Sequence, residues 1–163
     1  MVVPERVAFG GGCHWCTEAV FASLRGVVLV EQGWVSSEGM DFSEAVVVHF
    51  DPAQMPLRDL VDVHLHTHSA ASAHGMRGKY RSAVYCFSEQ QRTEVALLLD
   101  AAQAQFDKPL VTRALPFEAF KPSPEQYRQY YFNNPQKPFC ERWIGPKLQV
   151  LRDRYAMHVI PTV

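Results

Sequence analysis

The chain has 163 residues, of which 47% are hydrophobic and 20% are charged, and its formal net charge is −1. This size and composition predict one globular domain, long enough to bury roughly 70% of the surface of its unfolded chain. The balanced charge gives no reason to expect nucleic acid or a membrane surface as a partner, so the specificity must come from a local site. We expect the protein to be a monomer.

The cysteines indicate the compartment. Four of them, at positions 13, 16, 86 and 140, are too few and too scattered for a disulfide-stapled secreted scaffold. The first residues lack a basic segment followed by an apolar one, and no apolar run approaches membrane-spanning length. We therefore expect a cytoplasmic protein with reduced thiols, whose cysteines are catalytic, metal-bound or buried.

The first predicted elements are a strand, a glycine turn and a helix. The apolar segment 7–9 precedes three consecutive glycines and then Cys13. The helix is predicted because three residues spaced four apart share one of its faces: Cys16, Val20 and Leu24. Cys13 then lies at the helix N-terminus, where free backbone N–H groups and the helix dipole favour a thiolate.

The later elements follow from apolar periodicity and from turn residues. We expect antiparallel strands at 27–35 and 42–50, and a helix that starts near Pro56. A loop at 67–78, a strand at 80–87 and a helix from Glu89 to about Phe106 come next, with Ser88 and Gln91 spaced as a capping box. The remainder reads as an edge strand at 110–115, a turn after 117–120, a short helix at 125–132 and a last helix at about 141–155.

The order strand, helix, strand, strand, helix, strand is the split β-α-β-β-α-β, or ferredoxin-like, pattern. It predicts an α+β fold, a two-layer sandwich in a single domain that spans residues 1–163. The C-terminal segment is rich in Pro, Tyr and Phe. We expect it to form an irregular wrap over the sheet instead of extending it.

The thiols have different expected roles. Cys13 could be a small buried residue, but a glycine-rich turn, a helix start and the neighbouring Trp15 all act on its sulfur, which favours a reactive thiolate. Cys16 continues the apolar helix face, so a core role and a redox partnership with Cys13 both stay open. Cys86, between two aromatic residues, is expected in the core.

The run Phe9-Gly-Gly-Gly-Cys-His-Trp-Cys-Thr-Glu-Ala-Val-Phe21 resembles the active-site signature of the A-type peptide methionine sulfoxide reductases (MsrA). In that family Gly-Cys-Phe-Trp opens a helix, and here His14 replaces the Phe. The resemblance is strong at residues 9–21, 43–52 and 80–84 and weak at 66–79. It implies a cytoplasmic oxidoreductase of protein repair under oxidative stress, which reduces methionine S-sulfoxide, free or in proteins, with thiols and without a cofactor.

The resemblance assigns Cys13 as the nucleophile and Glu44 as the catalytic acid, because Glu44 lies eight residues before the Pro of Phe50-Asp51-Pro52. A carboxyl group beside Phe42 and the following valines is partly desolvated, which favours a retained proton. An exposed glutamate at the start of a strand is the alternative.

The substrate-binding residues are also implied. Tyr80 begins a segment that resembles the family's Gln-Tyr-Arg-Ser, whose Tyr donates a hydrogen bond to the sulfoxide oxygen, although a core tyrosine is an equal alternative. Trp15 can form one wall of a methyl pocket. Trp34 replaces a usual Tyr, and its ring N–H still donates. His14 either brings a cation to Cys13 or disturbs the methyl site, and both stay open.

Cys140 matches the family's resolving cysteine, which attacks the sulfenic acid of the nucleophile to form a disulfide. Cys16 is our second choice, and a packing role for Cys140 stays open. The resemblance implies that thioredoxin or a similar dithiol then reduces the disulfide.

One departure concerns a carboxylate. The family carries an Asp shortly before its Gln-Tyr-Arg-Ser segment, whereas no Asp occurs here between Asp62 and Asp100, and His74 or the backbone would have to substitute. A second hypothesis is therefore a catalytically weak member of the same fold that binds a small thiol or sulfoxide.

A third hypothesis is a metal-binding module that uses Cys13, Cys16 and nearby histidines. We expect no metal, because on a helix only His64 and His68 share a face and His66 points away.

Overall fold

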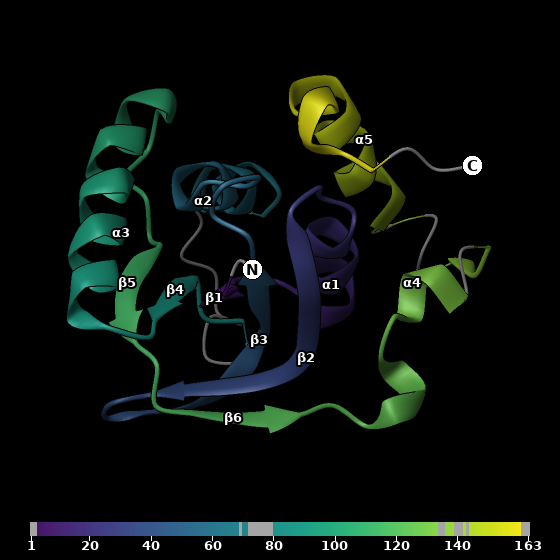
Figure 1. The fold of residues 1–163 in the computed structure, drawn as a ribbon, viewed down its shortest axis with the longest axis horizontal. Coiled ribbons are helices and arrows are strands. Elements are labelled where there is room, and N and C mark those ends of the chain that lie inside the picture. The colour runs from purple at the N-terminus through teal and green to yellow at the C-terminus, as the bar shows by residue number, and fades with distance from the viewer. Residues whose placement is uncertain are drawn as a thin grey trace.

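The computed structural model describes residues 3–68, 70–71, 80–133, 136–138, 142 and 144–160. Its centre is one six-stranded mixed sheet with the order β5-β4-β1-β3-β2-β6 (Figure 1). The strands are β1 Glu5–Gly10, β2 Val27–Ser37, β3 Met40–Phe50, β4 Ala83–Cys86, β5 Arg113–Pro116 and β6 Ala119–Pro122. The expected α+β class is confirmed.

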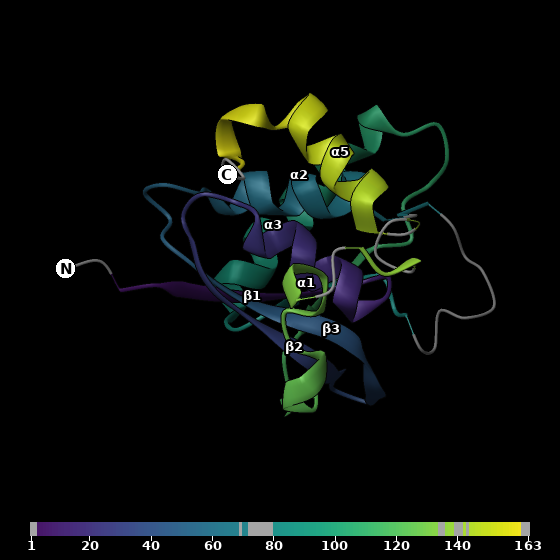
Figure 2. The same cartoon turned by 90° about the vertical axis from the view of Figure 1, so that its right-hand side faces the viewer.

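The α-helices are α1 His14–Ala22, α2 Leu57–His66, α3 Glu89–Ala102, α4 Tyr130–Asn133 and α5 Gly145–Arg154. Figure 2 shows α1, α2, α3 and α5 on one side of the sheet, with α5 outermost. Short 3-10 turns lie at Gln103–Gln105, Glu125–Tyr127 and Ala156–His158. Within the described part of the chain, no helix is long and apolar enough to cross a membrane.

The four middle strands of the sheet, in the order β4-β1-β3-β2, are the four strands of the β-α-β-β-α-β pattern that the sequence predicts. β1 pairs antiparallel with both β3 and β4, and β2 pairs antiparallel with β3. Two edge strands then enlarge the sheet, because β5 runs parallel to β4 and β6 runs antiparallel to β2. The prediction of a turn after 117–120 is therefore wrong, because β6 continues to Pro122.

Both faces of the sheet are buried, so its strands alternate between two sets of core residues. On the helix side Val7, Phe9 and Val46 pack with residues of α1, α2, α3 and α5. On the other side Ala8 and Tyr85 belong to a smaller cluster, against which Phe87, Phe117 and Phe120 pack. Burial of apolar side chains on each face contributes roughly 1.5–3 kcal/mol per large residue.

The C-terminal third is more regular than an irregular wrap, and this part of the prediction is wrong. β6 extends the sheet, and α5 places Leu148 and Leu151 in the main core. The helix expected at 125–132 is interrupted, because Gln129 has a φ of 52° between the 3-10 turn and α4. The last helix begins at Gly145, with Pro146 in its first turn.

Two further expectations have mixed outcomes. Ser88 caps α3 as predicted, since its Oγ accepts a hydrogen bond from the Gln91 backbone N at 3.1 Å. The Gln91 side chain in turn accepts from the Phe87 N at 2.8 Å, one residue earlier than in the capping box. Most of the loop predicted at 67–78 lies outside the described residues.

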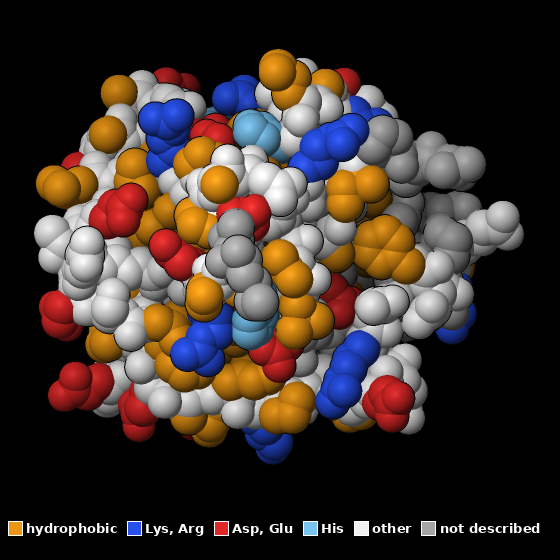
Figure 3. Space-filling model, viewed as in Figure 1, with side chains coloured by type: hydrophobic (Ala, Val, Ile, Leu, Met, Phe, Trp, Pro, Cys, Tyr) orange, Lys and Arg blue, Asp and Glu red, His pale blue; other side chains and the backbone are white. Residues whose placement is uncertain are grey.

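Acidic, basic and apolar side chains are intermixed on the face of the molecule drawn in Figure 3. This mixture agrees with the net charge of −1.

Candidate active site

The glycine turn between β1 and α1 presents Cys13. Cys13 is the N-cap residue of α1, and its carbonyl accepts hydrogen bonds from the backbone N of Cys16 at 3.0 Å and of Thr17 at 3.1 Å. Gly11 has a φ of 143°, and a Cβ there would come within 2.5 Å of the His68 ring. The predicted strand, glycine turn and helix are therefore confirmed, and the turn requires glycine at position 11.

Helix α2 supports this turn from behind. The His64 Nε2–H donates to the Gly10 carbonyl at 2.7 Å, and the His64 and His68 rings stack at 4.1 Å. The His68 Nδ1–H donates to the His64 carbonyl at 2.5 Å, which leaves Nε2 to accept from the Ser82 hydroxyl at 2.8 Å. Both histidines therefore hold the nucleophile's turn in place.

His66 is turned away from the other two histidines, as the helical spacing predicts. Its Nε2 meets the Gln105 side chain at 3.0 Å, and its ring stacks on Phe106 at 5.0 Å. Among the residues that the structure describes, no group of three or more His, Cys, Asp or Glu side chains is placed to hold a metal ion.

The surroundings of Cys13 favour a thiolate. Its pKa is lowered from the ordinary 9.0, first by a side-chain hydrogen bond from Cys16 and then by the backbone N–H groups of Trp15 and Cys16. Burial and the negative charge of Glu44 oppose this effect. Cys16 itself is only 3% exposed, so its sulfur lies in the core and also touches the nucleophile.

Cys86 is the opposite case. It is buried in β4, and burial raises the pKa of its thiol to about 12. The predicted core role of Cys86 agrees with this placement, because a neutral buried thiol is a poor nucleophile.

Glu44 lies next to the start of α1, which no sequence spacing alone predicts. It is 6% exposed, so the alternative of an exposed glutamate is wrong. Its Oε1 accepts a hydrogen bond from the backbone N of His14 at 3.1 Å and lies 3.6 Å from His14 Nε2. The His14 Nδ1–H donates to the Gly33 carbonyl at 2.8 Å, so the imidazole links β2 to this carboxyl group.

Aromatic rings surround the first turn of α1. Trp34 pairs with Glu44 across β2 and β3, and its ring meets His14 edge-on at 5.0 Å. Trp15 stacks on Tyr127 at 5.3 Å. The sequence reasoning did not single out Tyr127, because its partner lies 112 positions earlier in the chain.

The Tyr80 segment connects β4 to the hairpin that carries Glu44. Tyr80 is half-buried and precedes β4, which begins at Ala83, so the predicted start of this strand is too early and the core alternative for Tyr80 does not hold. The next residue, Arg81, was missed. Its backbone N donates to Ser43 Oγ at 2.8 Å, and its guanidinium donates to the Tyr85 hydroxyl at 3.0 Å.

Cys140 and His74 lie outside the described residues, so the resolving thiol and the candidate substitute for the absent Asp stay predictions.

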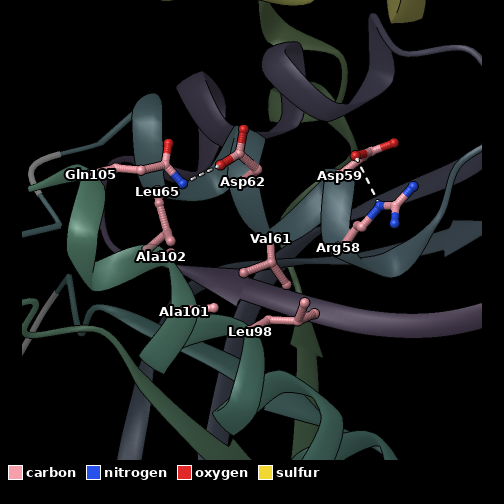
Figure 4. A pocket seen from close by; sticks show the side chains of 9 residues that line it. All are labelled: Arg58, Asp59, Val61, Asp62, Leu65, Leu98, Ala101, Ala102 and Gln105. Carbon is pink, nitrogen blue, oxygen red and sulfur yellow. Dashed lines mark hydrogen bonds and ion pairs between the residues drawn. The ribbon is translucent and has the colours of Figure 1, made fainter.

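A separate hollow lies between α2 and α3, with an apolar floor and an acidic rim (Figure 4). Its carboxylates already have partners, because Asp59 pairs with Arg58 and His158, and Asp62 accepts from the Tyr155 hydroxyl at 2.6 Å.

Known proteins resemble this chain over most of its length. The family model described as "Peptide methionine sulfoxide reductase" matches residues 5–158. The MsrA of Thermus thermophilus is 32% identical over 170 residues, which cover 94% of this chain and 97% of the relative. The MsrA of Deinococcus radiodurans is 33% identical over 169 residues, which cover 93% of this chain and 82% of the relative.

A solved structure shows the same fold. Reduced Mxr1 of Saccharomyces cerevisiae superposes with a TM-score of 0.74 at 21% identity, over 85% of this chain and 90% of that one. The family match, the two relatives and the placement of Cys13 at the glycine turn all agree. The chain therefore belongs to the peptide methionine sulfoxide reductase family, and it is an MsrA enzyme.

Proposed function

We propose that this reductase acts on the S epimer of methionine sulfoxide, free or in proteins, with Cys13 as the nucleophile. One observation carries the proposal: a thiol with a lowered pKa and a buried carboxyl group, Glu44, meet at the first turn of α1. The thiol suits attack on sulfur, and the carboxyl group suits delivery of a proton in a desolvated site.

In the proposed first step, the Cys13 thiolate attacks the sulfoxide sulfur and Glu44 protonates the sulfoxide oxygen. A transient bond joins the two sulfur atoms. The protonated oxygen then passes to the Cys13 sulfur as its bond to the substrate sulfur and the sulfur–sulfur bond break, so methionine leaves in the reduced form and Cys13 becomes a sulfenic acid. Tyr80 donates a hydrogen bond to the oxygen. Trp15, Trp34 and His14 form the walls of the methyl site, and their ring contacts around the start of α1 support this role.

A second thiol then attacks the sulfenic acid, which forms a disulfide and releases the oxygen as water. Cys140 is our first choice and Cys16 our second. The hydrogen bond between the Cys16 and Cys13 side chains supports the second route.

Thioredoxin or a similar dithiol reduces the disulfide in this proposal. Mxr1 of Saccharomyces cerevisiae, a fold relative, has been crystallised in complex with Trx2, which supports this choice of reductant. We further propose that the enzyme is a cytoplasmic monomer with one domain and a ferredoxin-like core.

Turnover of each epimer of methionine sulfoxide with dithiothreitol tests the proposal. Wild type should reduce the S epimer, Cys13→Ser should be inactive, and Glu44→Gln should lose at least about 100-fold in kcat, the contribution of a general acid. The glutamine can still accept the His14 backbone hydrogen bond, so it preserves the local geometry. Cys86→Ser is the matched control and should keep full activity, because this thiol lies away from the site.

A weakly active ligand-binding member of the family is the second candidate. Trp34 favours it, because an indole faces Glu44 across the hairpin where a smaller hydroxyl donor is usual. Wild type that binds the sulfoxide but reduces neither epimer would support this candidate and reject the first one.

A further inference from the structure

Helix α5 brings a lysine to the nucleophile's end of α1. Ile144, Leu148 and Leu151 are buried in the same core cluster as Cys16, so α5 is fixed against α1. Lys147 lies between the first two of these anchors and is half-buried. Its ammonium group is directed inward, because Nζ donates a hydrogen bond to a backbone carbonyl of the protein.

The lysine is held at the end of α2. Its Nζ donates a hydrogen bond to the carbonyl of Thr67, which is the C-cap residue of α2. A helix C-terminus carries a partial negative charge that attracts a cation. The same end of α2 supports the glycine turn, because His64 bonds Gly10 and His68 packs on Gly11. The ammonium group therefore lies where α5, α2 and the start of α1 meet.

The charges around Lys147 agree with this placement. Burial lowers the pKa of Lys147, and the negative charges of Cys16 and Cys13 act in the opposite sense and raise it. Other titratable groups near the glycine turn include His64 on α2, His68 just after it and Glu44 on β3. Lys147 has no part in the reaction steps proposed for Cys13 and Glu44.

We propose that Lys147 is a positioning residue of the reductase, whose ammonium group, held on the Thr67 carbonyl, stabilises the thiolate of Cys13. This inference rests on the proposed function. It links the docking of the C-terminal helix to the reactivity of the nucleophile, because the charge reaches Cys13 only when α5 is packed against α1 and α2. Lys147 acts through Cys13 and does not itself react.

Alkylation of Cys13 by iodoacetamide, followed by peptide mass spectrometry across pH, tests the charge effect without substrate. Lys147→Met should shift the profile to higher pH and slow alkylation at pH 7 about 3- to 10-fold, because fewer thiolates form. Lys147→Arg should restore most of the rate. Lys108→Met removes an exposed lysine as the matched control and should leave the profile unchanged.

The reciprocal measurement leaves Lys147 intact. Linkage requires that Cys13→Ser, which removes the thiolate, lowers the pKa of Lys147. An NMR titration of protein with isotope-labelled lysine follows this resonance in wild type and Cys13→Ser. The proposal stands if the Lys147 resonance titrates at lower pH in Cys13→Ser than in wild type, even where Lys147→Met folds poorly.

An unchanged alkylation profile in folded Lys147→Met, or an unchanged lysine titration in Cys13→Ser, would overturn the inference and leave Lys147 as a structural contact of Thr67. Failure of the proposed function looks different. In that case Cys13 still alkylates at low pH and depends on Lys147, but neither sulfoxide epimer is reduced.

Discussion

Cys13 and Cys86 carry the same thiol group, and their positions give them opposite chemistry. The Cys16 side chain and then the N–H groups of the helix start lower the pKa of Cys13, whereas burial raises the pKa of Cys86 to about 12. The reactive thiol of Cys13 could be predicted, because the sequence places Cys13 directly after three glycines and before an apolar helix face. Glu44 was predicted only through the family resemblance, since its partner His14 lies 30 positions away.

Cys16 is the largest contributor to the lowered pKa of Cys13, which gives a prediction at this scale. Cys16→Ala removes the side-chain donor, so the pKa of Cys13 should rise and the alkylation profile should move to higher pH. Cys16→Ser keeps an O–H donor and should stay closer to wild type. Site-resolved alkylation rates between pH 5 and 9 measure this, and identical profiles for the two variants would contradict it.

At the scale of elements, the turn before α1 is more constrained than its sequence shows. Three glycines look equivalent in the sequence, yet Gly11 has a positive φ and faces a histidine ring, whereas a Cβ at Gly12 would meet nothing within 4 Å. The strand β6 could not be predicted from the sequence either. β6 contains Lys121 and Pro122, which do not favour a strand, and it forms only because β2 offers an unpaired edge.

The two glycines form a matched pair for a stability test. Gly11→Ala should lower the free energy of unfolding by about 1–3 kcal/mol, because alanine is strained at this φ and its methyl group pushes His68 away. Gly12→Ala should change the free energy of unfolding by less than about 1 kcal/mol. Urea unfolding of both variants measures the difference, and equal losses would show that the turn does not depend on the His68 contact.

At the scale of the whole molecule, the C-terminal region closes the fold over the helices. α5 adds two leucines to the main core, and Tyr155 just after it donates to Asp62 on α2 at 2.6 Å. The sequence predicted a helix here but not its partners, because Lys147 and Tyr155 contact residues 80 and 93 positions earlier. Long-range polar contacts of this kind leave no periodic pattern, so the structure is needed to find them.

The Tyr155 contact predicts a pH dependence of stability. Burial and Asp62 raise the pKa of Tyr155 above its ordinary 10.0, so the folded state favours the protonated phenol. The phenol's contribution to the free energy of unfolding is fully present below pH 10, and it is lost as the pH rises through the folded-state pKa of Tyr155.

Tyr155→Phe should therefore lower the free energy of unfolding by about 1 kcal/mol at neutral pH, and the gap to wild type should narrow above pH 10. Urea unfolding at several pH values measures the gap. A gap that widens with pH would contradict the assignment of the phenol as a donor.

The most direct test of Cys13 as the reacting nucleophile is a single-turnover experiment with a sulfenic acid trap. A Cys16→Ser/Cys140→Ser double variant lacks both candidate resolving thiols and keeps a donor beside Cys13. Mixed with methionine S-sulfoxide and dimedone, it should form one methionine per enzyme and one dimedone adduct, located on Cys13 by mass spectrometry, whereas the R epimer should give neither. Methionine formed without a Cys13 adduct, or no methionine from the S epimer, would contradict the proposed mechanism.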